Sequence, residues 1–172
     1  MEEFINCFAC GAKTLNVPGE SHPYMLSSPG CWMMYGEVLE REYSDVRYSR
    51  AHHFTVDAFA IQHPGNQSDI RAVNSVNIHL ASLYMIFERG LNVSEAAVFK
   101  NNYAQHHKGK YIFEWLQPPE SSSELTIFDI WNNEKPELHA GLSEKWARSV
   151  WHQWAPHHKH VEQLVNRFLD KR

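Results

Sequence analysis

Three cysteines near the start of the chain constrain its fold more than any other feature. Cys7 and Cys10 stand in the sequence Cys-Phe-Ala-Cys-Gly, and Cys31 follows after an irregular stretch. An odd number of cysteines argues against a disulfide framework, and clustered cysteines in a reducing compartment more often serve metal binding or catalysis. Two thiolates spaced this way can face one ion, while Gly11 permits the tight turn that aims backbone N–H groups at sulfur.

A structural zinc ion takes four ligands, so the cysteine pair needs two more. Cys31 is the obvious third, because it is predicted to lie in the first turn of a helix that starts at Pro29. Unpaired N–H groups and the helix dipole favour a thiolate at that position. Our candidate for the fourth ligand is His22. We therefore expect zinc as the cofactor, bound by Cys7, Cys10, His22 and Cys31.

Two other interpretations fit the same cysteines. They could be three free thiols, with Cys31 in the core, or Cys7 and Cys10 could be a thioredoxin-type redox pair with the same spacing. Redox pairs normally follow a strand, and residues 1–6 are poor strand material, which weighs against the redox interpretation. The fourth ligand also has competitors, because His52 and His63 could replace His22.

Composition is that of an ordinary globular protein, with 172 residues, 43% hydrophobic and 21% charged. The net charge is −4 and no block of Lys and Arg stands out, so we do not expect sequence-independent binding to nucleic acid. No apolar run is long enough to span a membrane, and the first residues lack the basic and apolar regions of a signal peptide. We expect a cytoplasmic protein whose small-molecule or protein partner the sequence does not identify.

Apolar residues recur at helical spacing through most of the chain, which predicts a mainly α fold: a compact helical domain with an irregular, cysteine-containing N-terminal arm. We expect one domain over 1–172, made of a metal-binding arm (1–30), a first helical part (31–116) and a Trp-rich helical part (125–172). Residues 111–116 are expected to form a short strand or an extended loop. The helices are expected at about 29–43, 54–62, 69–89, 94–103, from Ser143 to about 154, and 158–169.

A second polar group of residues surrounds the helix predicted over 54–62. His52, Asp57 and His63 lie on or beside this helix, and His79 is expected on the inward side of the next one. Helical bundles build metal sites from such side chains on facing helices, and an open coordination position makes a site hydrolytic. The alternative function is therefore a metal-dependent hydrolase with these four residues as catalytic candidates. Structural hydrogen bonding is the favoured explanation of these residues, because His52 and His63 lie about three helical turns apart and could not hold one ion unless the helix bends or ends.

Several longer strings in the sequence resemble an uncharacterised family of small bacterial proteins, a domain of unknown function. The shared pattern is CxxCG, then HxYMxSSPGCW, VDAxAxQHPG and SVxxHL, and it covers residues 7 to about 90 well and the Trp-rich part loosely. The resemblance implies that the Cys and His pattern is a family hallmark, but it implies no activity. His53 stands where a basic residue is more familiar, which makes it a poor ligand candidate. We expect a zinc-binding protein with a structural metal and an activity that the sequence leaves open.

Overall fold

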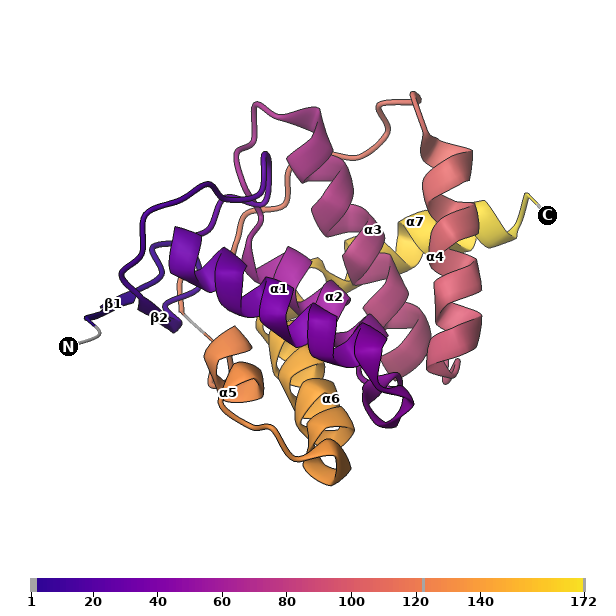
Figure 1. Cartoon of the computed structure of the whole chain (residues 1–172). Coiled ribbons are helices and arrows are strands. Elements are labelled where there is room, and N and C mark those ends of the chain that lie inside the picture. Colours follow the sequence, from indigo (N-terminus) through magenta and orange to yellow (C-terminus); the bar gives the residue numbers. More distant parts are fainter. Residues whose placement is uncertain (1–2, 122, 172) are drawn as a thin grey trace.

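Helices dominate the computed structural model of the chain, which describes residues 3–121 and 123–171 (Figure 1). The predicted mainly α fold is confirmed. Within these residues, β structure is limited to one short antiparallel hairpin. The elements in chain order are β1 (Phe4–Asn6), β2 (Lys13–Leu15), α1 (Pro29–Ser44), the 3₁₀ turn η1 (Val46–Tyr48), α2 (His52–Gln62), α3 (Ile70–Phe87), α4 (Val93–His107), α5 (Ile127–Trp131), α6 (Pro136–Gln153), the 3₁₀ turn η2 (Ala155–His157) and α7 (His158–Leu169).

Local signals set most helix starts. Pro29 occupies the first turn of α1 as predicted, where its fixed φ suits a helix and its missing N–H is not needed. The start of α4 lies at Val93 rather than at the predicted Ser94, because Asn92 forms a capping box with Glu95. The Asn92 side chain accepts from the Glu95 N–H over 3.0 Å, and the Glu95 carboxylate accepts from the Asn92 N–H over 2.9 Å.

Two local predictions differ from the structure, and a third had two alternatives of which the structure shows one. Residues 1–6 were expected to be poor strand material, yet β1 pairs with β2, with Ile5 opposite Thr14. The last long helix begins at Pro136, and Ser143, its expected cap, is buried in the middle of α6. Residues 111–116 were expected to form a short strand or an extended loop. They form the extended loop, since their backbone pairs with no strand among the described residues.

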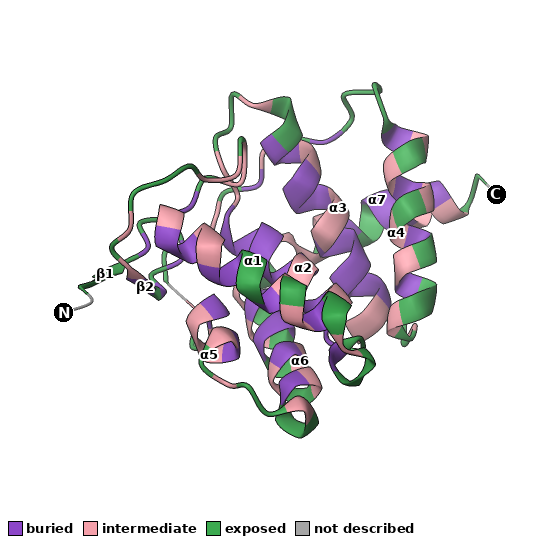
Figure 2. Cartoon of the chain, viewed as in Figure 1, coloured by how far each residue is buried: buried purple, intermediate pink, exposed green. Residues whose placement is uncertain are grey.

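The core forms around α2 and α3, which Figure 2 shows as the most extensively buried helices. Helix α2 packs against α3 and α6, while α3 also packs against α4 and α7. The tryptophans of the C-terminal part lie inside this core: Trp146, Trp151 and Trp154 are almost completely buried. Large flat side chains therefore supply much of the buried apolar area. Within the described ranges, no helix has both the length and the hydropathy that a membrane span requires.

The N-terminal hairpin packs on one end of α1, where the backbones approach closely. A Cβ added to Gly30 would lie 2.0 Å from the carbonyl oxygen of Leu15, so only glycine allows β2 to come this near. Helix α1 also packs against α2 and α5. As a result, the turn between β1 and β2, the first turn of α1 and the end of α2 meet at one point.

Candidate metal centre

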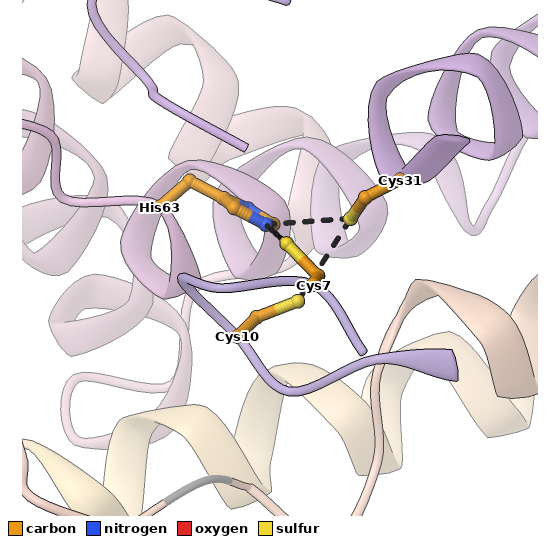
Figure 3. Close-up of side chains that lie close together, drawn as sticks. All are labelled: Cys7, Cys10, Cys31 and His63. Carbon is orange, nitrogen blue, oxygen red and sulfur yellow. Dashed lines mark hydrogen bonds between the residues drawn. The ribbon is translucent and has the colours of Figure 1, made fainter. Parts of the chain in front are cut away.

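Four buried side chains converge where these three segments meet: Cys7, Cys10, Cys31 and His63 (Figure 3). Their ligand atoms all lie within 4.8 Å of one another. The Cys10 and Cys31 sulfurs are 3.8 Å apart, and His63 Nε2 lies 3.4 Å from the Cys31 sulfur and 3.9 Å from the Cys7 sulfur. None of the four residues is more than 4% exposed.

The hairpin turn positions the first two sulfurs. The Cys7 N–H donates to the Ala12 carbonyl over 2.8 Å, and the Gly11 N–H donates to the Cys7 carbonyl over 2.9 Å. Gly11 adopts φ 75°, a left-handed conformation that glycine adopts without strain. The turn therefore holds Cys7 and Cys10 on the same side of the hairpin end, as Figure 3 shows.

The third sulfur comes from the start of α1. Cys31 is the third residue of this helix, within the turn whose N–H groups have no partner inside the helix. The helix dipole stabilises negative charge at this end, which favours a thiolate at Cys31. The backbone N–H of Ser28, just before the helix, donates to the Cys7 sulfur over 3.4 Å. The start of α1 thus stabilises two of the three sulfurs: the helix dipole acts on Cys31, and the Ser28 N–H donates to Cys7.

His63 supplies the nitrogen from the C-terminal end of α2. Its ring packs against Phe59, one turn earlier, with the ring centroids 4.0 Å apart. Its Nδ1 donates to the Phe59 carbonyl oxygen over 2.7 Å. Because Pro64 follows and disfavours the helical conformation at His63, the helix ends here. The Nδ1 hydrogen bond leaves the Nε2 lone pair facing the sulfurs, as a metal ligand requires.

The charges of these groups depend strongly on one another. The neighbouring Cys10 and Cys31 thiols hold the pKa of Cys7 far below its ordinary value, while Cys10 and Cys7 raise the pKa of Cys31 far above it. Burial disfavours the charged form of His63, but the Cys10 and Cys7 sulfurs outweigh burial and raise its pKa to about 9. Three thiolates packed this closely repel one another, so a multivalent cation is what allows all three to ionise.

The donor set and its spacing fit a tetrahedral metal ion. With Zn–S bonds of about 2.3 Å and Zn–N bonds of about 2.0–2.1 Å, tetrahedral ligand separations are roughly 3.8 Å for two sulfurs and roughly 3.6 Å for sulfur and nitrogen. The contacts of 3.8 Å, 3.4 Å and 3.9 Å agree with these values to within a few tenths of an ångström. The buried Cys₃His group can therefore hold a metal ion.

A scan against known families finds one match, described as a family of unknown function (DUF5946), over residues 5–155. The chain belongs to this family. The match includes all four residues of the Cys₃His group and ends within η2, before α7. Neither the curated proteins nor the solved structures contain a match to the chain. Membership in DUF5946 therefore confirms the predicted resemblance. Because the function of the family is unknown, an inference about function has to rest on the site itself.

His22, the sequence-based candidate for the fourth ligand, lies outside the group in this family member. Its Nδ1 accepts from the backbone N–H of Met25 over 3.3 Å and faces the N–H of Tyr24 at 3.4 Å. Its ring packs edge-on against Tyr24 and Trp32. His22 therefore orders the arm before α1, and His63 takes the fourth position. Spacing along the chain does not distinguish the two histidines, since His63 reaches the cysteines only through the packing of α2.

The proposed catalytic residues also separate into three places. His63 joins the cysteines, and the His52 Nδ1 donates to the Glu42 carboxylate over 3.2 Å. Asp57 and His79 do lie together, with the His79 Nδ1 donating to the Asp57 carboxylate over 2.6 Å. The structure therefore does not bring His52, Asp57, His63 and His79 into one group.

Each of the two buried carboxylates has partners that sequence reasoning missed. Asp57 also accepts from Lys100 and Ser82, both at 2.6 Å. Glu42, on α1, is also buried, with 3% of its surface exposed. It accepts from Thr55 over 2.6 Å and from His139 over 2.8 Å. The only sequence signal for Glu42 is its helical spacing from the buried Val38 and Tyr35.

Proposed function

We propose that the chain binds one zinc ion through Cys7, Cys10, Cys31 and His63, and that the ion is structural. The observation that carries the proposal is that three ligand-atom separations agree with the edges of a tetrahedral zinc site, while all four ligand atoms lie within 4.8 Å of one another. Thiolates and imidazole together suit zinc, while hard oxygen ligands, which magnesium and calcium prefer, are not part of the group.

A structural role follows from the number of protein ligands and their burial. Four protein ligands complete the coordination of zinc, whereas catalytic zinc sites keep a position for water or substrate. The ligands come from three segments that are distant in the chain: the hairpin turn, the start of α1 and the end of α2. The ion would cross-link these segments, so its binding free energy would contribute directly to folding.

The alternative of a metal-dependent hydrolase has less support. Its candidate ligands lie in three separate places, and within residues 3–121 and 123–171 the Cys₃His group is the one cluster whose donor atoms are close enough for a metal ion. Asp57, the carboxylate of that alternative, is already paired with Lys100 and His79. We therefore assign the metal to the cysteines.

Elemental analysis of the purified protein tests the proposal. We expect one zinc per chain after dialysis, and thiolate-to-cobalt charge-transfer bands when cobalt replaces zinc. Conversion of Cys31→Ser should abolish stoichiometric zinc binding, whereas Ser44→Ala, at the far end of α1, should retain it. Purified wild-type protein without metal, whose three thiols react freely in the folded state, would refute the site. Bound iron in place of zinc would refute the metal assignment.

A further inference from the structure

The three cysteine sulfurs of the proposed zinc site differ in their surroundings, and the inference below rests on that site. The Cys7 sulfur accepts from the Ser28 N–H over 3.4 Å. The Cys31 sulfur lies in the first turn of α1. Hydrogen bonds and helix dipoles stabilise thiolates and reduce their nucleophilicity. Among the described residues no backbone N–H is found to donate to the Cys10 sulfur, so Cys10 lacks the backbone hydrogen bond that the Cys7 sulfur has.

Cys10 also lines a cavity, unlike the other three ligands. This cavity of about 60 Å³ lies between the hairpin turn, the end of α2 and the segment around Pro118. The inner wall includes Ile61 and Trp154, and the outer end includes the exposed Ala9 and Ser121. Because roughly 10–15 Å³ of such space is enough for one water molecule, the cavity has room for a small molecule such as hydrogen peroxide. Cys7, Cys31 and His63 do not line the cavity.

A partner for an oxidised Cys10 is already in place. The Cys31 sulfur lies 3.8 Å from the Cys10 sulfur. A disulfide needs a separation of about 2.0 Å, so the two sulfurs must approach by roughly 1.8 Å. Cys10 is in a hairpin turn with an exposed neighbour on the chain, Ala9, so the turn can supply this movement.

We propose that Cys10 is a modification site for small hydroperoxides and that its oxidation releases the metal. The Cys10 thiolate attacks one oxygen of the O–O bond, which breaks; Cys10 becomes a sulfenic acid, and the other oxygen leaves with a proton as water or alcohol. The Cys31 thiolate then attacks the Cys10 sulfur, the S–O bond breaks, and the oxygen leaves with a proton as water. Two thiolates supply the two electrons that reduce the peroxide.

Release of the metal follows from the loss of ligands. A Cys10–Cys31 disulfide removes two of the four metal ligands. Only Cys7 and His63 then remain. Two ligands do not retain zinc at a site that needs four. The size of the cavity also sets the oxidant class: hydrogen peroxide fits, whereas a bulky hydroperoxide or a disulfide such as oxidised glutathione does not.

The test uses the full chain loaded with zinc and treated with hydrogen peroxide. Zinc release is followed with a chromogenic chelator, and disulfides are mapped by peptide mass spectrometry. We expect one zinc released for each Cys10–Cys31 disulfide formed, and release at least about tenfold slower with cumene hydroperoxide. A Cys7–Cys10 disulfide, or zinc retained under peroxide, would each overturn the proposal.

Variants of Ala9 test the access route without touching a ligand. Ala9→Leu narrows the outer end of the cavity and should slow zinc release by roughly fivefold or more, whereas Ala9→Ser should react like the wild type. Equal rates in the two variants would refute entry through this cavity. The zinc content of each sample, measured beforehand, keeps the two proposals apart: protein that never holds metal refutes the zinc site, and loaded protein that resists peroxide refutes only the role of Cys10.

Discussion

The Nδ1 atom of His63 donates to the carbonyl oxygen of Phe59, 2.7 Å away and one turn earlier in α2. The carbonyl lies near the helix end, where carbonyl groups lack partners within the helix. The bond also fixes which ring nitrogen of His63 faces the sulfurs. The same helix that builds the core therefore orients the nitrogen of the proposed metal site. Burial of the core and metal binding should thus be coupled.

His63 and His22 offer a direct comparison of the two fourth-ligand candidates. His63→Ala removes the only nitrogen of the Cys₃His group and should weaken zinc binding by more than about 100-fold. His22→Ala removes an acceptor of local N–H groups and should leave one zinc per chain. Competition with a chelator of known affinity measures both. Loss of zinc in His22→Ala with retention in His63→Ala would reverse the assignment.

Gly30 tests the contact between the hairpin and α1. A Cβ there would lie 2.0 Å from the Leu15 carbonyl oxygen, so Gly30→Ala must displace β2 from the helix that carries Cys31. We expect a loss of about 1–3 kcal/mol in the free energy of unfolding, with weaker zinc binding.

Gly36→Ala, in the same helix, is the matched control. No atom lies within 4 Å of its added Cβ, and alanine favours helix by about 1 kcal/mol, so this variant should be slightly more stable. Urea unfolding of the zinc-loaded proteins measures both changes. Equal stabilities would show that the hairpin does not depend on this close approach.

Asp57 is a buried carboxylate that joins α2, α3 and α4 through His79, Ser82 and Lys100. Asp57→Asn leaves the ammonium of Lys100 without its counter-charge and should destabilise the fold by about 3–5 kcal/mol. The double variant Asp57→Asn with Lys100→Met should recover part of that loss. A single variant as stable as the wild type would show that the pair contributes nothing.

Acid should weaken this part of the fold in two steps. Burial raises the pKa of Asp57, but Lys100 and His79 outweigh burial and hold it below its ordinary value. Its contribution is therefore present above about pH 4 and lost as the pH falls further. Burial lowers the pKa of His79, so the fold favours its neutral form, and stability should begin to fall below about pH 6.5. Urea unfolding across this pH range measures both steps, and Asp57→Asn should lack the lower one.

Glu42 provides a second buried acid with a different set of partners. Burial raises its pKa, but hydrogen bonds from His139, His52 and Thr55 outweigh burial and lower it. Glu42→Gln keeps the shape but presents an N–H₂ group to donors, so we expect a loss of about 2–4 kcal/mol at pH 7. The exposed Glu40→Gln should change the stability by less than about 0.5 kcal/mol. Thermal unfolding at pH 7 compares the two, and equal melting temperatures would refute the role of Glu42.

Sequence patterns predicted helices well where the signal was local. Pro29 marked the start of α1, and the apolar spacing of α3 and α7 lies within each helix. The hairpin was missed because β1 has only three residues and depends on pairing with β2 and packing on α1. The early start of α6 was missed because serine is a common N-cap residue, which favoured a helix start at Ser143. In the structure the Ser143 side chain is buried beside Thr55, in the middle of α6.

The sequence by itself determined that this protein is mainly helical and that its three cysteines are candidate ligands for one ion, because both signals depend on the spacing of near neighbours. Only the tertiary structure decided which histidine joins them and that Glu42 and Asp57 are buried with partners from other helices. His22 lies closer to Cys31 along the chain, yet the end of α2 brings His63 to the sulfurs. Contacts between distant segments are set by how helices pack, which local spacing does not encode.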